Sequence, residues 1–301
     1  AETALLVARR AGPASVRAFS PEMLKARIAE DSLFHEVRRA LENGEIRPWF
    51  QPQVCAASGK LTGFEALARW EHPERGLIPP KEFLPTIESA GLLARLGEVN
   101  LTHCLTAINA WDNGGFDVRT VGINFSSDEL RNPRLVDSMK WELDQAGVAP
   151  ERLTIEILET VVANSDDDTI TKNIAALAQL GCNIDLDDFG TGHASIANIR
   201  RFAVGRIKID RSFVTRLDQD ADQQALLGAI LSMAERLRLD TLAEGVQTVA
   251  EHAMLRKMGC GHIQGFGLAK PMPFDETSPW MQTYRRKVAK SSGTQLLTAA
   301  Q

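Results

Sequence analysis

Acidic side chains recur at the carboxyl ends of short apolar segments along this chain. They are Glu65, Glu156, the adjacent pair Asp187 and Asp188, and Glu244. A carboxylate buried at the end of a strand costs several kcal/mol unless it is paired or bound to a cation. A single residue of this kind is explained by packing, but the repeated set indicates one cation site to which several strands contribute.

Two of these segments suit hard cations in particular. Asn124 ends the apolar run 120–125, and amide and carboxylate oxygens are the ligands that Mg²⁺ and Mn²⁺ prefer. Taken alone, Asn124 is typical of a turn at a strand end, and Asp187-Asp188 before Phe-Gly is typical of a tight turn. Two adjacent aspartates can, however, contact neighbouring metals, and metals about 3.5–4 Å apart support in-line attack on a phosphodiester.

Lys208 lies within the apolar run 205–209, where a buried ammonium group needs an acidic partner. Such a lysine either forms a structural ion pair or holds and polarises an attacking water. Gly190 and Gly192 allow the loop after the run 182–187 to bend sharply. That loop is either mobile, so that it gates metal occupancy, or a plain tight turn.

The elements that must position these residues follow from apolar runs that alternate with amphipathic helical patterns. The predicted strands are 47–55, 61–69, 120–125, 153–157, 182–187, 205–209, 239–243 and 262–266, with helical patterns such as 169–180 and 223–237 between most of them. This alternation predicts an α/β fold, a modified (β/α)8 TIM-like barrel whose active site lies at the carboxyl ends of the strands. Because residues 56–60 are too few for a parallel crossover, we predict one antiparallel strand.

The bulk composition limits the partners and the compartment. A net charge of −5 over 301 residues argues against a nucleic-acid partner, although metals that mask the carboxylates would permit a phosphate substrate. The four cysteines are far apart, which is typical of thiols in a reducing cytosol, and Cys260 with His262 offers too few ligands for zinc. No apolar run is long enough to span a membrane, and the start does not resemble a signal peptide. We therefore predict a cytoplasmic segment without membrane contact.

Together these segments resemble the EAL-domain phosphodiesterases, bacterial signalling enzymes that hydrolyse cyclic di-GMP. The resemblance covers about residues 46–275 and depends on an ordered set of motifs. The motifs are Phe50-Gln51-Pro52, Glu65-Ala66-Leu67-Ala68-Arg69-Trp70, Ile123-Asn124-Phe125-Ser126, Ile155-Glu156-Ile157-Leu158-Glu159, Asp187-Asp188-Phe189-Gly190-Thr191-Gly192, Lys208-Ile209-Asp210, Ala243-Glu244-Gly245-Val246 and Gln264-Gly265-Phe266. A lone Glu-Ala-Leu has no meaning, but this set spread across a barrel is highly specific.

The resemblance implies a role for each site residue. It implies a first metal held by Glu65, Asn124, Glu156 and Asp187, and a second held by the bridging Asp187 and by Asp188. It implies that Lys208 and Glu244 orient and deprotonate the bridging water, that Gln264 supports them, and that Glu159 anchors the loop after the run 182–187. It also implies that Gln51 and Arg69 contact the dinucleotide, Arg69 through its planar fork.

The function implied by the resemblance is hydrolysis of cyclic di-GMP to linear pGpG with Mg²⁺ or Mn²⁺ at two metal positions. We expect Ca²⁺ to bind and to inhibit, because its longer bonds and looser geometry misplace the attacking water. The alternative is a non-catalytic cyclic di-GMP receptor of the same fold, and a hydrolase of an unrelated phosphoester is more distant. The departures from the family pattern are His193, Gln247, Ala203 and Gly205, and none removes a metal ligand. The resemblance implies a homodimer, and Ala203 and Gly205 bear on its strength.

The chain ends lie outside the predicted barrel of residues 46–287. Residues 1–45 have a largely helical pattern, and the segments 4–12 and 16–19 resemble the end of a GGDEF-type diguanylate cyclase domain. The N-terminal segment is thus either a helical extension or the remnant of an upstream regulatory domain, whose further segments could anchor a longer protein to a membrane. Residues 288–301 are small and polar, and we predict a disordered tail.

Overall fold

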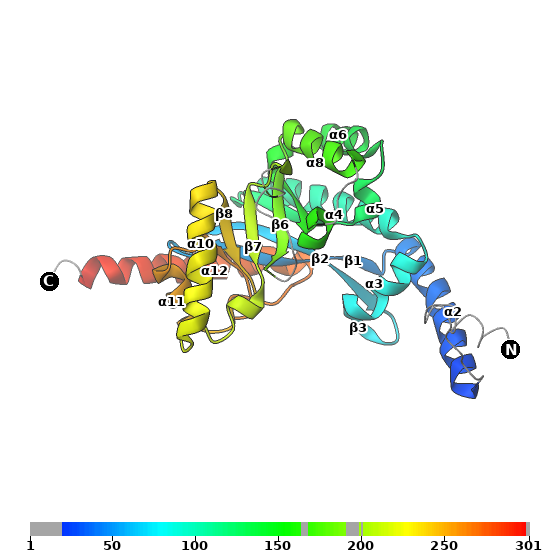
Figure 1. Ribbon diagram of the computed structural model, residues 1–301, viewed down its shortest axis with the longest axis horizontal. Coiled ribbons are helices and arrows are strands. Elements are labelled where there is room, and N and C mark those ends of the chain that lie inside the picture. The colour runs from blue at the N-terminus through cyan, green and yellow to red at the C-terminus, as the bar shows by residue number, and fades with distance from the viewer. Residues whose placement is uncertain (1–19, 164–167, 191–198, 200, 299–301) are drawn as a thin grey trace. The chain divides into compact units, whose positions relative to one another are not determined.

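The computed structural model describes residues 20–163, 168–190, 199 and 201–298 of the chain (Figure 1). These residues belong to two compact units. The smaller unit comprises Ala1–Arg47 with Arg69–Leu96, and the larger comprises Pro48–Ala68 with Gly97–Gln301. The larger unit contains most of the sheet and nearly all of the predicted site residues.

The sheet closes into the predicted barrel. Its eight strands are β1 (Ile46–Cys55), β2 (Leu61–His72), β4 (Thr120–Phe125), β5 (Leu153–Leu158), β6 (Asn183–Phe189), β7 (Arg206–Ile209), β8 (Asp240–Ala243) and β9 (His262–Ile263). They follow the order β1-β9-β8-β7-β6-β5-β4-β2, and a further β1–β2 pairing closes the ring. Neighbours from β2 through β4 to β9 are parallel, whereas β1 is antiparallel to β9. The modified (β/α)8 fold with one antiparallel strand is therefore confirmed.

A tight turn reverses the chain between β1 and β2. The amide of Cys55 donates to the carbonyl of Lys60 at 2.9 Å, and Gly59 donates to the carbonyl of Cys55 at 2.8 Å. Gly59 has φ 67°, a left-handed conformation that costs glycine little. The short connection therefore forms a hairpin, as its length predicts.

The last strand is shorter than its apolar pattern predicts. We expected residues 262–266, but β9 ends at Ile263. Gly265 lies so close to Val246 that a Cβ atom there would be 2.2 Å from the Val246 carbonyl oxygen. The chain therefore leaves the strand where it must pass against a neighbouring backbone segment.

The hydrophobic core surrounds the barrel, and polar side chains fill its interior. In β6 and β7, Ile184, Leu186, Ile207 and Ile209 pack with the helices, while the residues between them are charged. The helices of this unit are α4 (Leu93–Asn113), α5 (Ser127–Leu130), α6 (Leu135–Ala146), α7 (Glu159–Ala163), α8 (Asp168–Leu180), α10 (Ala221–Leu237), α11 (Val249–Lys257) and α12 (Phe274–Thr298), with 3-10 turns at Pro150–Arg152 and Arg211–Phe213. Figure 1 shows α10 in yellow beside β7 and β8. Because successive side chains of a strand point to opposite faces, the apolar residues of β6 and β7 face the helices and the charged residues between them face the barrel interior.

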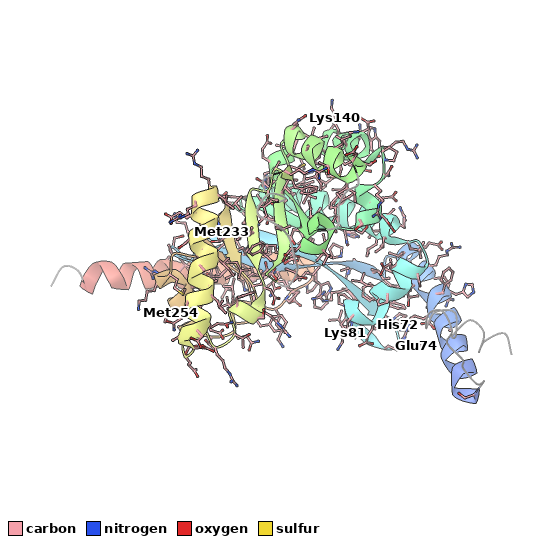
Figure 2. All side chains as sticks on the ribbon, viewed as in Figure 1. His72, Glu74, Lys81, Lys140, Met233 and Met254 are labelled. Carbon is pink, nitrogen blue, oxygen red and sulfur yellow. The ribbon has the colours of Figure 1, made fainter. Side chains whose placement is uncertain are left out.

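The smaller unit contains α2 (Pro21–Glu42), the short strand β3 (Gly76–Ile78) and α3 (Pro80–Ser89). Trp70 is buried there, packs edge-on against Phe83 and donates from Nε1 to Glu45 Oε2 at 3.1 Å. His72 and Glu74 lie at the turn between β2 and β3, and Lys81 lies in α3 (Figure 2). We did not predict β3, because three residues are too few to show a periodic pattern.

The structure agrees with the sequence-based prediction before the barrel and differs from it at the carboxyl-terminal tail. The helical pattern predicted before the barrel is found in α2, while residues 1–19, which carry the GGDEF-like resemblance, lie outside the described residues. The predicted disordered tail at 288–301 differs from the structure, where α12 continues to Thr298. Lysine, alanine, glutamine and leucine favour helix, and no proline interrupts this stretch. None of the helices in the described ranges is both long and apolar enough to cross a membrane.

Candidate active site

Lys208 on β7 lies at the centre of a cluster of carboxylates inside the barrel. Its Nζ lies 2.7 Å from Glu156 Oε2, 2.9 Å from Glu244 Oε1, 3.1 Å from Asp187 Oδ1 and 3.3 Å from Glu65 Oε1. The lysine is fully buried. The structure thus brings together residues of β2, β5 and β6, and the residue after β8, as the strand-end pattern predicts.

The charges of this cluster do not balance, because one ammonium group faces four carboxylates. Burial raises the pKa of Glu156 well above its usual value, and the charge of Glu65 adds to this. Burial also raises the pKa of Glu244 to about 8, although Lys208 opposes the shift. Burial would lower the pKa of Lys208, but its acidic neighbours, Asp187 first, hold it well above the usual value. An excess of buried negative charge is stable when further cations compensate it.

The donor atoms of the cluster fit divalent cations. Glu156 Oε1 is buried and has no hydrogen-bond partner among the described residues, so it has a lone pair for a ligand. Gly122 makes room for it, since a Cβ atom there would lie 2.1 Å from this oxygen. Two groups of carboxylates have ligand atoms within 4.8 Å of one another: Glu65, Glu156 and Asp187, and Asp187, Asp188 and Glu244. Asp187 belongs to both, and all the donors are oxygens, as Mg²⁺ and Mn²⁺ prefer.

Asp188 takes a different backbone conformation from its neighbour. Its φ of 54° is left-handed, which aspartate tolerates better than most residues. Its amide donates to Asp187 Oδ1 at 2.9 Å, and burial together with the charge of Asp187 raises its pKa. The irregularity of β6 between Leu186 and Phe189 therefore gives two adjacent aspartates different directions. This arrangement suits one carboxylate that is shared by two cation positions and a second carboxylate that serves one position.

Amide side chains hold the carboxylate of Glu65. Gln264 Nε2 donates to Glu65 Oε2 at 2.5 Å and to Gln51 Oε1 at 3.0 Å. Gln51 donates in turn to the carbonyl of Ala269 at 3.0 Å, and Asn124 Nδ2 donates to Glu65 Oε1 at 3.2 Å. These bonds and Lys208 outweigh burial and lower the pKa of Glu65. Gln51, Asn124 and Gln264 thus lie at the cluster, as their motifs predict.

Glu159 contacts the root of the loop that follows β6. Its buried carboxylate accepts a hydrogen bond from the amide of Gly190 at 2.8 Å. Gly190 has φ 98°, and a Cβ atom there would lie 2.5 Å from the ring of Phe213. The predicted contact between Glu159 and this loop is therefore present at its first residue, whereas Gly192 and His193 lie outside the described residues.

A cavity of about 260 Å³ opens beside the cluster and contains residues that the sequence did not single out. Glu65, Asp187, Glu244 and Gln264 line it together with Arg211 and Phe266. Phe266 is 60% exposed, so its ring is available for stacking. Arg211 approaches because Gly245 has no side chain, since a Cβ atom at Gly245 would lie 2.4 Å from Arg211 Cβ.

The sequence signals for these additional residues differ. Phe266 ends the Gln-Gly-Phe motif and could have been considered, whereas no sequence signal pointed to Arg211. Arg69, the predicted phosphate contact, is half-buried on β2 four residues after Glu65. It belongs to the smaller unit and is not among the residues that line this cavity.

The comparisons with known proteins agree with this geometry. The family model of the EAL domain matches residues 35–271. The chain belongs to the EAL-domain family. The cluster around Lys208 is therefore the acidic centre of an EAL domain, and it can bind a metal ion.

Relatives of the chain are signalling proteins. The bifunctional diguanylate cyclase/cyclic di-GMP phosphodiesterase MucR of Pseudomonas aeruginosa is 37% identical over 81% of this chain and 36% of its own length. The cyclic di-GMP phosphodiesterase PdeR of Escherichia coli is 33% identical over 95% of this chain and 43% of its own length. The chain thus spans less than half of these curated relatives.

Solved structures share the fold. A complex of the MucR phosphodiesterase with c-di-GMP has a TM-score of 0.77 and 37% identity, and the match covers 81% of this chain and 99% of that one. The EAL domain of FimX has a TM-score of 0.73 and 26% identity, with 80% and 96% covered. The fold of this chain is thus that of other EAL domains.

Proposed function

We propose that this EAL domain hydrolyses cyclic di-GMP to linear pGpG in a reaction that requires Mg²⁺ or Mn²⁺. The observation that carries the proposal is the complete set of acidic ligands around Lys208, with Asp187 common to two possible cation positions. Two neighbouring divalent cations suit in-line displacement at a phosphodiester. The relatives MucR and PdeR are both named as cyclic di-GMP phosphodiesterases, which supports the same activity.

The residues of the cluster divide between two tasks. Glu65, Asn124, Glu156 and Asp187 would hold one cation, and Asp187 with Asp188 the other. When bound, these cations lower the pKa of water and neutralise charge on the phosphate. The ion selectivity follows from the oxygen donors, and Ca²⁺ should inhibit because its bonds are longer and its geometry is looser.

Lys208 and Glu244 would orient and deprotonate the attacking water. Lys208 donates a hydrogen bond to the water oxygen, and Glu244 accepts the proton as the oxygen attacks phosphorus. The phosphorus–oxygen bond that closes the ring breaks, and the leaving ribose oxygen takes a proton from solvent. Gln264 keeps Glu65 in place through its 2.5 Å hydrogen bond, so it acts as a positioning residue.

Substrate contacts come from residues beside the cluster. Gln51 offers its amide, Arg211 offers a guanidinium group suited to phosphate, and the exposed ring of Phe266 can stack on a guanine base. The family resemblance adds Arg69 as a further phosphate contact. These contacts would orient the dinucleotide with one phosphate at the acidic centre. They supply affinity, whereas the carboxylates supply the cations on which turnover depends.

Regulation would act through the loop after β6 and through assembly. The hydrogen bond from Gly190 to Glu159 connects the loop to the barrel, and Asp188 lies two residues before Gly190. The outward face of α10 carries Ala225, Leu226 and Ala229, and Leu226 is 55% exposed, which supports a homodimer through this helix. An upstream regulatory domain in a longer protein would bias the loop or the dimer.

The test is to incubate the purified chain with cyclic di-GMP and Mg²⁺ and to identify the product by chromatography and mass. We expect one linear dinucleotide for each cyclic molecule consumed, full loss with chelator, recovery with Mn²⁺ and inhibition by Ca²⁺. An equilibrium binding measurement in Ca²⁺ runs in parallel. Tight binding without product in Mg²⁺ and in Mn²⁺ would identify a receptor instead of an enzyme.

A further inference from the structure

The amino-terminal end of the barrel contains a second hollow, at the opposite ends of the strands from the Lys208 cluster. Two adjoining cavities of about 430 Å³ and about 710 Å³ share Thr62, Arg119 and His262. Volumes of this size are typical of small-molecule sites. None of the residues assigned to the proposed active site lines either cavity, so the hollow is separate from it.

The inner part of this hollow is polar and close to neutral. Arg206 donates from Nε to Asp185 Oδ2 at 2.7 Å, and His262 Nε2 lies 2.8 Å from Asp240 Oδ2. Arg206 also donates to Gln53 Oε1 at 3.2 Å, although Gln53 itself lines neither cavity. The charged groups of the inner part are therefore already paired, and they add no net charge for a ligand.

The outer part combines an apolar wall with positive charge. Leu61, Phe116, Met281, Tyr284 and Val288 form the wall. Three cationic side chains, Lys60, Arg119 and Arg285, line the same cavity against one acidic side chain, Asp117. The outer cavity therefore carries an excess of two positive charges over a surface on which an apolar chain can lie.

We propose that this hollow binds a small amphiphilic anion, a molecule with one carboxylate or phosphate head and a short apolar body. The body lies against Met281 and Tyr284, and the head is bound by the guanidinium groups of Arg119 and Arg285. Guanidinium suits either head, because its planar fork donates two parallel hydrogen bonds. Arg206 does not contribute charge, since Asp185 neutralises it. This binding is independent of the proposed hydrolysis.

Isothermal titration of the metal-free chain tests the proposal without any turnover. The probes are octanoate, monooctyl phosphate, neutral 1-octanol and inorganic phosphate. We expect octanoate or octyl phosphate to bind, and the tighter of the two identifies the head that the site prefers. Octanol and inorganic phosphate should each bind about tenfold more weakly or not at all, because each lacks one half of the ligand.

Variants locate the binding. Arg285→Ala should lower the affinity for the anionic probe about tenfold. Arg286 is an exposed neighbour that does not line the cavity, so Arg286→Ala should leave the affinity unchanged. Val288→Trp should fill the outer cavity and abolish binding, with a melting curve to verify the fold. Equal binding to Arg285→Ala and Arg286→Ala would overturn the proposal. So would equal binding of octanol, displacement of octanoate by inorganic phosphate at equal concentration, or no binding of either anionic probe.

Discussion

Two cations on the same strand face different surroundings inside this barrel. Arg206 and Lys208 are two residues apart on β7, so both side chains point inward. Arg206 pairs with a single carboxylate, that of Asp185, and with the amide of Gln53. Lys208 contacts four carboxylates within 3.3 Å. The amino-terminal pair is balanced, and the carboxyl-terminal cluster has an excess of negative charge.

The difference in charge balance distinguishes a structural ion pair, Arg206 with Asp185, from a functional cluster, the carboxylates around Lys208. A balanced buried pair needs no further ion, and it is costly to break because the remaining partner stays buried and charged. A cluster with excess carboxylates is incomplete by itself, since like charges repel at short range. The raised pKa values of Glu156 and Glu244 express this repulsion as well as burial. Loss of one carboxylate should therefore have opposite consequences at the two places.

The largest effect is expected from Glu65→Gln, which removes a charge from the cluster. Lys208 keeps three carboxylates, so the melting temperature without metal should stay the same or rise. Turnover of cyclic di-GMP should fall at least about 100-fold, because the variant loses a metal ligand and not a supporting residue. Initial rates at saturating Mg²⁺ measure the turnover, and a melting curve without metal measures the stability. Near-normal turnover would show that Glu65 does not belong to the reactive centre.

Asp185→Asn should give the reverse result at the balanced pair. It leaves Arg206 buried without a carboxylate, and we expect a loss of about 3 kcal/mol in the free energy of unfolding. Chemical denaturation measures this loss, and turnover per folded molecule is expected to change little. A stability close to wild type would mean that Gln53 or water solvates Arg206 well enough, and that the contrast between the two cations is weaker than the charges indicate.

Glu159→Ala should affect the cluster indirectly, through the loop after β6. The variant removes the acceptor of the Gly190 amide, so the position of Asp188 becomes less defined. Turnover and apparent metal affinity should fall about tenfold, with a smaller effect on thermal stability. Turnover measured at increasing metal concentrations gives the effect on activity and metal affinity, and a melting curve gives the effect on stability. An unchanged metal dependence would mean that the loop is only a connector.

Phe266→Ala tests whether the exposed aromatic ring contributes affinity and not chemistry. Loss of one stacking contact should raise KM about tenfold while kcat stays nearly constant. Leu77→Ala, another exposed apolar residue that does not line the cavity beside the cluster, is the matched control. If kcat falls with KM unchanged, the ring positions the reacting phosphate instead.

The smallest effect is expected at a surface pair that repeats the one-to-one pairing of Arg206. Arg152 donates to both carboxylate oxygens of Asp112, and these hydrogen bonds lower the Asp112 pKa. A lowered folded-state pKa stabilises the protein above the unfolded value, and this stability is lost as pH falls through the folded value. The difference in melting temperature between wild type and Asp112→Asn should therefore stay constant above the unfolded-state value of 3.8 and shrink as pH falls below it. A difference in melting temperature that stays the same at low pH would contradict the stabilising role of the Arg152–Asp112 pair.

The sequence alone determined the barrel and the identity of the acidic centre. The strand positions follow from local periodicity, and all eight predicted strands have both ends within three residues of the observed ends. Glu65, Glu156, Asp187 and Glu244 converge because the carboxyl ends of parallel strands meet at one end of a barrel. The order of the motifs along the chain specified the family without any knowledge of contacts.

Only the tertiary structure decided how the charges are shared. Gln264 and Glu65 are 199 positions apart, and Lys208 and Glu156 are 52 apart, so no local pattern reports these contacts. The same is true of Glu156 Oε1, which has no hydrogen-bond partner in the described part of the chain, of Arg211 beside the cluster and of the hollow at the amino-terminal end. A strand pattern specifies which residues face inward, but the closure of the barrel determines which of them meet and whether their charges balance.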